Sequence, residues 1–217
     1  KGVVVRQLYG LTEGGGNTSI MPAEGALDHP EQCGRGGIFT KHRIVDEHGV
    51  DCPPGVPGEI WVRGPAVMKG YWNAPEATAA AIVDGWLRTG DVATMDEHGN
   101  MQIIDRLKDM IISGGLNIWP LDIEAVIGGL EEVEEVAVIG VHDERFGETV
   151  MAIIRSNGGL QVEDVIDWCN QKLADYKVPR YVVVQQEPLP RLATGKLNKR
   201  ELRQIWQNAS ERLQKVR

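Results

Sequence analysis

The sequence predicts an α+β protein in which a mostly β first half is followed by a compact half that contains both strands and helices. Between residues 38 and 104, short stretches with partial alternation are separated by Gly, Pro and acidic turn signals. After residue 105, apolar residues recur at helical spacing in three stretches that are interleaved with apolar strands. A boundary is expected near residue 105, where DRLKDMIISGG places four charges ahead of a Gly-Gly turn.

The first half is expected to contain mainly strands and loops. A short buried strand is predicted at Val3 to Val5, followed by a Gly-rich loop that extends to residue 20. Further strands are predicted in HRIVDEHG, GEIWVRG and MQIID. One helix, PEATAAAIV, interrupts them, because Pro75 and Glu76 suit a first helical turn and Gly85 ends the pattern.

The second half is expected to alternate helices with apolar strands. A helix is predicted over 120–130 and another over 162–174, each with one apolar face. Strands are predicted around VAVIGV, VMAIIRS and YVVVQQ, and a last helix carries Leu202, Ile205 and Trp206. About a hundred residues of this kind form a domain of ordinary size.

Composition argues against several classes of function. The 23 basic and 31 acidic residues give a net charge of 23 − 31 = −8, which does not favour binding to nucleic acid or to an anionic membrane. The three cysteines are far apart, so neither a disulfide framework nor a zinc site is predicted, and reduced thiols suggest a cytoplasmic protein. No apolar run reaches the length of a membrane helix. Because the chain opens on Lys1 rather than Met and leads directly into a strand-like run, it is expected to be a fragment.

Four separated stretches have compositions that suit chemistry. YGLTEGGG places Thr12 and Glu13 beside three glycines, where backbone amides could approach an anion while a carboxylate holds a cation. DGWLRTGDVA ends at a turn near Asp91, whose carboxylate could accept two hydroxyl hydrogen bonds. Taken singly, either stretch could equally be an ordinary turn.

The other two stretches lie at the boundary and near the C-terminus. IIDRLKDMIISGGLNIWP combines four charges with a Gly-Gly turn and could be an ion-paired linker or a hinge. LPRLATGKLNKREL sets Lys196 in a Gly-containing turn before a basic helix, where it could be a solvated charge or a placed cation.

Together these stretches resemble the C-terminal part of an AMP-forming acyl-CoA synthetase, in the adenylate-forming superfamily that also contains firefly luciferase and the adenylation domains of peptide synthetases. The matching motifs are YGLTEG, GEIWVRGPAVMKGYWNAPEAT, DGWLRTGDVATMDEHGNMQIIDRLKDMIISGGLNIWPLDIE and PRLATGKLNKRELR. The resemblance extends from about Leu8 to Leu202. It implies a reaction of a carboxylic acid with ATP and CoA, assisted by Mg²⁺, as in fatty acid metabolism.

The resemblance also implies roles for residues on the nucleotide side. Thr12 and Glu13 would meet ATP phosphate and Mg²⁺, with Glu13 as the metal ligand. Tyr9 and Gly10 would lie beside the adenine and the acyl pocket. Asp91 would bind the ribose hydroxyls.

The remaining implied roles concern the boundary and the second half. Arg106 would add a ribose or phosphate contact, Lys108 would be the pivot of a mobile small domain, and Lys196 would be the adenylation lysine. A loop would line the pantetheine tunnel for CoA; its residues are Ser113, Gly114, Gly115 and Asn117.

The implied domains are the β-barrel-like tail of a large ATP-binding domain at 1–104, a hinge at 105–109 and a small domain at 110–217. One departure is PLDIE, which has Asp122 where the family has Glu. The family's Ser/Thr/Gly-rich phosphate loop should precede Tyr9 and is not present, so the chain alone is expected to be inactive. Two alternatives stay open: a catalytically incomplete nucleotide- or CoA-binding module, and an adenylation domain that acts on a carrier protein. Neither the acid nor the oligomeric state follows from the sequence.

Overall fold

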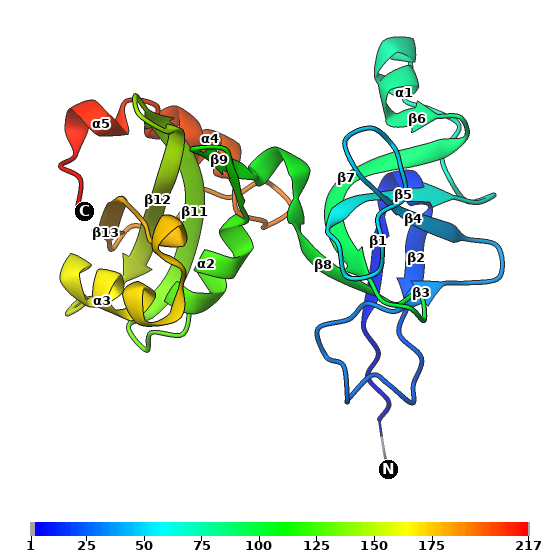
Figure 1. The fold of residues 1–217 in the computed structure, drawn as a ribbon, viewed down its shortest axis with the longest axis horizontal. Helices are drawn as coiled ribbons and strands as arrows, with labels where there is room; N and C mark the ends of the chain where they lie inside the picture. The colour runs from blue at the N-terminus through cyan, green and yellow to red at the C-terminus, as the bar shows by residue number, and fades with distance from the viewer. Residues whose placement is uncertain (1–2, 217) are drawn as a thin grey trace. The chain divides into compact units, whose positions relative to one another are not determined.

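The computed structural model describes residues 3–216, and the contacts within the chain divide it into two units, Lys1–Leu107 and Lys108–Arg217. Each unit has its own strands and its own apolar core (Figure 1). Among residues 3–216, no helix has both the length and the apolar character that crossing a lipid bilayer requires.

The first unit contains two sheets, and every strand pair in them is antiparallel. The smaller sheet has the order β1-β2-β3; its strands are β1 Leu8–Leu11, β2 Gly16–Ile20 and β3 Arg35–Gly36. The larger sheet has the order β4-β5-β7-β6, with β8 also paired to β7. Its strands are β4 Lys41–Val45, β5 Gly58–Arg63, β6 Ile82–Val83, β7 Trp86–Met95 and β8 Met101–Arg106. Two short helices complete the unit, the 3-10 helix η1 Thr12–Gly14 and the α-helix α1 Pro75–Ala81.

The core of the first unit lies on the larger sheet. Alternate residues of its strands point inward, as the period of a strand requires, and Ile60, Val62, Leu87 and Ala93 are buried. Tyr9 and Leu11 of β1 pack against the same cluster. Strand β1 therefore brings the YGLTEGGG stretch next to the sheet that carries Asp91.

The second unit is built on a five-stranded sheet with helices on both faces (Figure 1). Its order is β10-β9-β12-β11, with β13 paired parallel to β12. The strands are β9 Ile111–Ser113, β10 Leu116–Ile118, β11 Val133–Asp143, β12 Gly147–Ser156 and β13 Tyr181–Gln185. The α-helices are α2 Pro120–Ile127, α3 Val162–Lys172, α4 Lys199–Ile205 and α5 Ala209–Arg212. Two 3-10 helices are η2 Leu107–Asp109 and η3 Asp175–Lys177.

Successive side chains of β11 and β12 point alternately to the two faces of the sheet, and each face carries its own buried cluster. Val138 and Ile154 face the cluster that includes residues of α2 and α3. Ile139 and Ile153 face the cluster that includes Leu202 of α4 and Ala209 of α5. Both faces of these strands are covered, which explains why their sequences are apolar runs rather than alternating patterns.

Several expectations about local structure were wrong. Val3 to Val5 do not form a buried strand: they have no regular structure, and their exposed fractions are 86%, 68% and 70%. The expected helix over 75–83 ends at Ala81, because Ile82 and Val83 pair with β7 as strand β6.

Two further expectations need correction. The helix expected over 120–130 ends at Ile127, because Gly128 and Gly129 follow it. Ile205 is 45% exposed, so the apolar face of the last helix is narrower than its sequence suggested. The expected combination of strands and helices is confirmed, and the strands described in the first unit, expected to be β-barrel-like, form two open sheets that do not close into a barrel.

Candidate functional site

Asp91 is the centre of the polar cluster in the first unit. It lies on β7 in register with Arg106 of β8. Asp91 is only 8% exposed. One carboxylate oxygen accepts a hydrogen bond from the Tyr9 hydroxyl at 2.7 Å, and the other forms an ion pair with Arg106 Nε at 3.2 Å. Three of the residues named from the sequence, on strands β1, β7 and β8, therefore meet at one carboxylate.

Burial determines the protonation state of the Tyr9 phenol. Loss of solvent raises the pKa of Tyr9 far above its usual value; the Thr89 hydroxyl acts in the opposite direction, and the charge and hydrogen bond of Asp91 raise the pKa further. The phenol consequently remains a hydrogen-bond donor throughout the neutral range, which suits an ionised carboxylate as its partner.

The turn expected before Asp91 is not formed, because Thr89 and Gly90 lie within β7, where its pairing with β5 shifts register. This part of β7 is fixed by Glu59, which the sequence analysis did not identify. Glu59 is 8% exposed, and its carboxylate accepts hydrogen bonds from the Gly90 amide at 3.0 Å and from Trp61 Nε1 at 2.9 Å. The Thr89 hydroxyl donates to Ile60 O at 2.8 Å and accepts from the Asp91 amide at 3.1 Å. A charged residue inside an apolar strand was the available signal for Glu59, because a buried carboxylate requires partners.

Thr12 and Glu13 form the short helix η1 directly after β1. Thr12 is exposed and Glu13 is half-buried. One oxygen of the Glu13 carboxylate accepts a hydrogen bond from the Tyr71 hydroxyl at 3.0 Å. Gly10 is required by backbone packing, since a Cβ there would lie 2.0 Å from Gly16 O. The close approach of β1 and β2 explains this glycine without a ligand.

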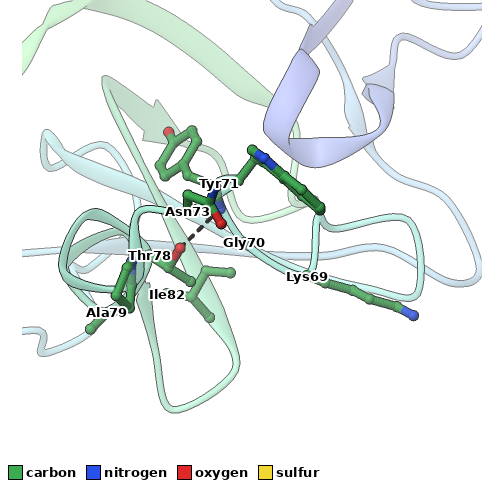
Figure 2. A pocket seen from close by; sticks show the side chains of 9 residues that line it. Lys69, Gly70, Tyr71, Asn73, Thr78, Ala79 and Ile82 are labelled. Atoms are coloured by element: carbon green, nitrogen blue, oxygen red, sulfur yellow. Dashed lines mark hydrogen bonds between the residues drawn. The ribbon is translucent and has the colours of Figure 1, made fainter.

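Tyr71 belongs to a loop that forms one wall of an open pocket beside α1, which Figure 2 shows. The Tyr71 amide donates to the Thr78 hydroxyl at 2.9 Å, and that hydroxyl donates to Ala74 O at 2.9 Å. The first turns of α1 thus hold the loop that places the Tyr71 hydroxyl against Glu13. Tyr71 was quoted only as part of a motif in the sequence analysis and was not named as a site residue.

Lys108 lies in η2, at the start of the second unit, and is exposed. The residues on either side of it are anchored to different units. Arg106 pairs with Asp91 of the first unit, whereas Asp109, which is 8% exposed, accepts a bond from Arg203 Nη1 at 2.9 Å within the second unit. The backbone at Lys108 therefore connects two fixed points.

The expected CoA loop is the tip of a hairpin. Ser113 ends β9, Gly114 and Gly115 form the turn, and Asn117 lies on β10. Both glycines have positive φ, 57° and 84°, which a two-residue hairpin turn of this kind demands. The Gly114 amide donates to Phe146 O at 2.9 Å.

Lys196 is exposed and directly follows Gly195, whose φ is 84°, at the end of a tight turn. Its neighbours among the basic residues are engaged elsewhere: Lys199 pairs with Glu124 at 2.8 Å, and Arg203 pairs with Asp109. Within residues 3–216, the Lys196 ammonium has neither an ion pair nor a side-chain hydrogen bond. The structure thus presents Lys196 as an available cation.

The two units divide the predicted residues between them. Tyr9, Asp91 and Arg106 are joined in the first unit, and Glu13 lies on the helix that follows β1. Lys196 and the hairpin of residues 113–117 belong to the second unit, on separate elements.

Two families match successive parts of the chain. The family described as AMP-binding enzyme matches residues 1–72, and the AMP-binding enzyme C-terminal domain matches residues 122–196. A feruloyl-CoA synthase from an Amycolatopsis species is 42% identical over 205 residues, which are 94% of this chain and 42% of the relative. The long-chain-fatty-acid–CoA ligase FadD13 of Mycobacterium tuberculosis is 42% identical over 207 residues, which are 95% of this chain and 41% of the relative. The chain thus spans about two fifths of the length of these relatives.

A solved structure agrees with the sequence relatives. The o-succinylbenzoate CoA synthetase of Bacillus subtilis, in complex with its acyl-adenylate intermediate, superposes with a TM-score of 0.85 at 34% identity. The match covers 91% of this chain and 40% of that protein. With two matching family models in order and relatives of one kind over nearly its whole length, this chain belongs to the AMP-binding enzyme family.

Proposed function

We propose that the whole protein that carries this chain is an AMP-forming acid–thiol ligase. A carboxylate oxygen of the acid attacks the α-phosphorus of ATP, and pyrophosphate leaves. The sulfur of CoA then attacks the acyl carbonyl, loses its proton, and AMP leaves. The observation that carries this proposal is the Tyr9–Asp91–Arg106 cluster, because it is a preformed acceptor for a nucleoside in a chain of the adenylate-forming family.

Asp91 is suited to accept hydrogen bonds from a ribose. Each of its oxygens is engaged by one protein donor, so lone pairs remain for two hydroxyl groups. The side chain of Arg106 is 52% exposed, which leaves guanidinium donors for a sugar or phosphate oxygen. Tyr9 and Gly10 lie on the same strand, at the position that we assign to the adenine and the acyl group.

Glu13 is suited to hold Mg²⁺ in one common way. This ion is often bound by one or two carboxylates together with waters and substrate phosphates. Glu13 provides one such carboxylate, half-buried on η1, with ATP phosphates and waters as the other ligands. When bound, Mg²⁺ would neutralise charge on the pyrophosphate oxygens. The chain itself contributes the Glu13 carboxylate, fixed by Tyr71, and the exposed Thr12 hydroxyl beside it.

Lys196 would supply the cation for adenylation. The acid and the α-phosphate are both anionic, so a placed positive charge lowers the barrier to their approach. Lys196 is exposed and has no partner among residues 3–216, which leaves its ammonium for such a contact.

Lys108 would serve as the pivot between a large domain over 1–104 and a small domain over 110–217, with 105–109 as the hinge. Its anchored neighbours favour this role, since the rotation must then be absorbed at η2. The hairpin residues Ser113, Gly114, Gly115 and Asn117 would face CoA in the thioester step.

The proposal can be tested by a screen of pyrophosphate release from the whole protein. The acids to compare are ferulic acid, palmitic acid and o-succinylbenzoic acid, which follow the names of the relatives, each with and without CoA. We expect acid-dependent release of pyrophosphate and, with CoA, formation of the acyl-CoA and AMP. Release of ADP or phosphate instead of AMP and pyrophosphate would contradict the proposal. Adenylation without transfer to CoA would favour a carrier protein as the acceptor.

A further inference from the structure

The carbonyl that directly precedes Lys196 is linked to the sheet by the side chain of Arg191. Arg191 Nη1 donates to Gly195 O at 2.7 Å, and Arg191 Nη2 donates to Glu135 Oε1 of β11 at 2.9 Å. Gly195 directly precedes Lys196. We propose that Arg191 and Glu135 are a positioning pair that fixes the direction of the Lys196 side chain for adenylation. This inference rests on the proposed role of Lys196.

The tip of the turn is exposed, and its backbone–backbone hydrogen bonds lie within the turn. Residues 191–196 are all exposed. Three backbone hydrogen bonds close the turn: from the Leu192 amide to Lys196 O at 2.9 Å, from the Gly195 amide to Leu192 O at 2.8 Å and, at its base, from the Asn198 amide to Pro190 O at 2.8 Å. Leu197, directly after Lys196, packs against the buried cluster that includes Leu189. These contacts hold the ends of the turn, and the guanidinium of Arg191 links the carbonyl beside Lys196 to β11.

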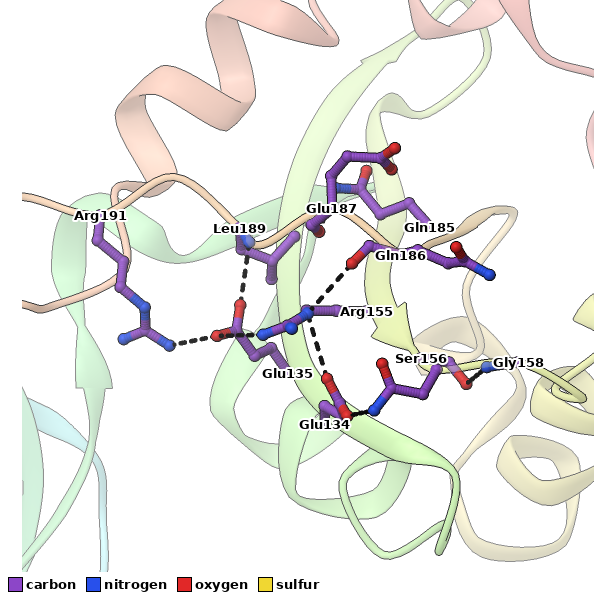
Figure 3. Close-up of polar contacts among 11 residues, drawn as sticks. Glu134, Glu135, Arg155, Ser156, Gly158, Gln185, Gln186, Glu187, Leu189 and Arg191 are labelled. Atoms are coloured by element: carbon purple, nitrogen blue, oxygen red, sulfur yellow. Dashed lines mark hydrogen bonds and ion pairs between the residues drawn. The ribbon is translucent and has the colours of Figure 1, made fainter.

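Glu135 is a firm anchor for this contact, as Figure 3 shows. Its side chain is 14% exposed, and Oε2 accepts a hydrogen bond from the Leu189 amide at 3.0 Å. Leu189 is 2% exposed and belongs to the buried cluster beneath α4. The bond from Arg191 lowers the pKa of Glu135, with the Leu189 amide contributing in the same direction and burial opposing both. The anchor therefore stays charged at neutral pH.

The shape of an arginine suits this role. The planar guanidinium presents fixed donors in two directions, so one group can hold a carbonyl and a carboxylate together. A lysine has a single ammonium at the end of a flexible chain and does not reproduce that fixed fork. The contact thus depends on the geometry of Arg191 in addition to its charge.

Arg155 provides a matched control on the same anchor. Its Nη1 lies 3.6 Å from Glu135 Oε1, and its Nε pairs with Glu134 at 3.2 Å and donates to Gln186 O at 3.2 Å. None of these contacts reaches the turn of residues 191–196. Replacing Arg155 removes a charge beside Glu135 but leaves the bond to Gly195 in place.

The experiment measures the two half-reactions of the whole protein separately, with the acid that gives most pyrophosphate in the screen above. Because a displacement of about 1 Å can reduce a rate on the order of 10²-fold, Arg191→Gln should slow adenylation about 10- to 100-fold. Thioester formation from supplied acyl-adenylate and the KM for ATP should each change less than about threefold. Arg155→Gln should stay within about twofold of wild type in both half-reactions. Circular dichroism checks that each variant is folded.

A double-mutant cycle separates positioning from direct contact with ATP. If Arg191 acts through Glu135, Arg191→Gln combined with Glu135→Gln should be no slower than the worse single variant. Losses that multiply would show that Arg191 acts independently and would overturn the proposal. Arg191→Lys should recover only part of the rate; full recovery would also overturn it, because charge alone would then suffice. If Glu135→Gln does not fold, the comparison of Arg191→Lys with wild type still tests the proposal.

Lys196→Ala, measured in parallel, distinguishes the proposed role of Lys196 from the proposed role of the positioning pair. If Lys196→Ala abolishes adenylation while Arg191→Gln stays within about twofold of wild type, only the positioning proposal fails. If Lys196→Ala retains adenylation, the role of Lys196 fails, and the positioning pair fails with it.

Discussion

Replacing Tyr9 by Phe should destabilise the first unit more than the same replacement at Tyr71. Both hydroxyls donate to a carboxylate, at 2.7 Å from Tyr9 to Asp91 and at 3.0 Å from Tyr71 to Glu13. Asp91 is 8% exposed, whereas Tyr71 is 41% exposed and Glu13 is half-buried. The two variants therefore remove the same hydroxyl group, once from a buried hydrogen bond and once from a more exposed one.

The expected magnitudes follow from that difference. A hydrogen bond to a charged group contributes about 1.5 to 3 kcal/mol, and loss of a buried donor leaves the acceptor undersatisfied. Because Arg106 still pairs with Asp91, we expect the lower part of that range for Tyr9→Phe, about 1.5 to 2 kcal/mol. For a unit of roughly a hundred residues, this corresponds to a Tm lower by roughly 6–15 °C. Tyr71→Phe should cost at most about 1 kcal/mol, as is usual for exposed polar pairs.

Calorimetry and urea denaturation followed by circular dichroism would measure these changes. The urea midpoint should move at constant m-value, since neither variant alters the area exposed on unfolding. If the two variants lose the same free energy of unfolding, or if Tyr9→Phe loses none, the reasoning that burial of Asp91 makes its hydrogen bond costly to remove is refuted.

Three further predictions concern catalysis and pH. Lys196→Ala in the whole protein should lower the adenylation rate by about 10² to 10³ while sparing thioester formation from supplied adenylate; equal losses in both half-reactions would make Lys196 a structural or general charge. Lys108→Pro should spare adenylation and slow thioester formation, because Pro fixes φ at the proposed pivot; parallel losses would argue against a pivot. Burial lowers the pKa of His42 to about 4, whereas the pKa of an unfolded His is 6.5. His42 therefore makes its full contribution to the stability of the folded state above pH 6.5. That contribution is lost as pH falls from 6.5 through 4. The free energy of unfolding should therefore fall by about 1 to 3 kcal/mol more in wild type than in His42→Gln across this window, measured by urea denaturation at each pH; identical profiles would exclude a buried neutral His42.

The sequence by itself determined where most helices and strands of this protein lie. Pro75 and Pro120 each occupy the first turn of a helix, and the apolar runs that became β11 and β12 were recognisable by composition. The motifs also named Asp91 and Arg106 as candidate site residues, and the structure brings the two side chains together. The helices and strands are local features, and the chain pattern therefore suffices to predict them.

Only the tertiary structure decided which polar groups meet and which apolar residues are covered. Tyr9 and Asp91 are separated by 82 positions, and their hydrogen bond exists because β1 packs on the sheet that contains β7. Glu59 and Arg191 likewise bond to partners that are distant in sequence. Val3 to Val5 form an apolar run but are exposed. An apolar run is buried only if another element packs over it. Burial and pairing depend on the whole packing of the chain, so a local pattern can suggest a residue but cannot supply its partner.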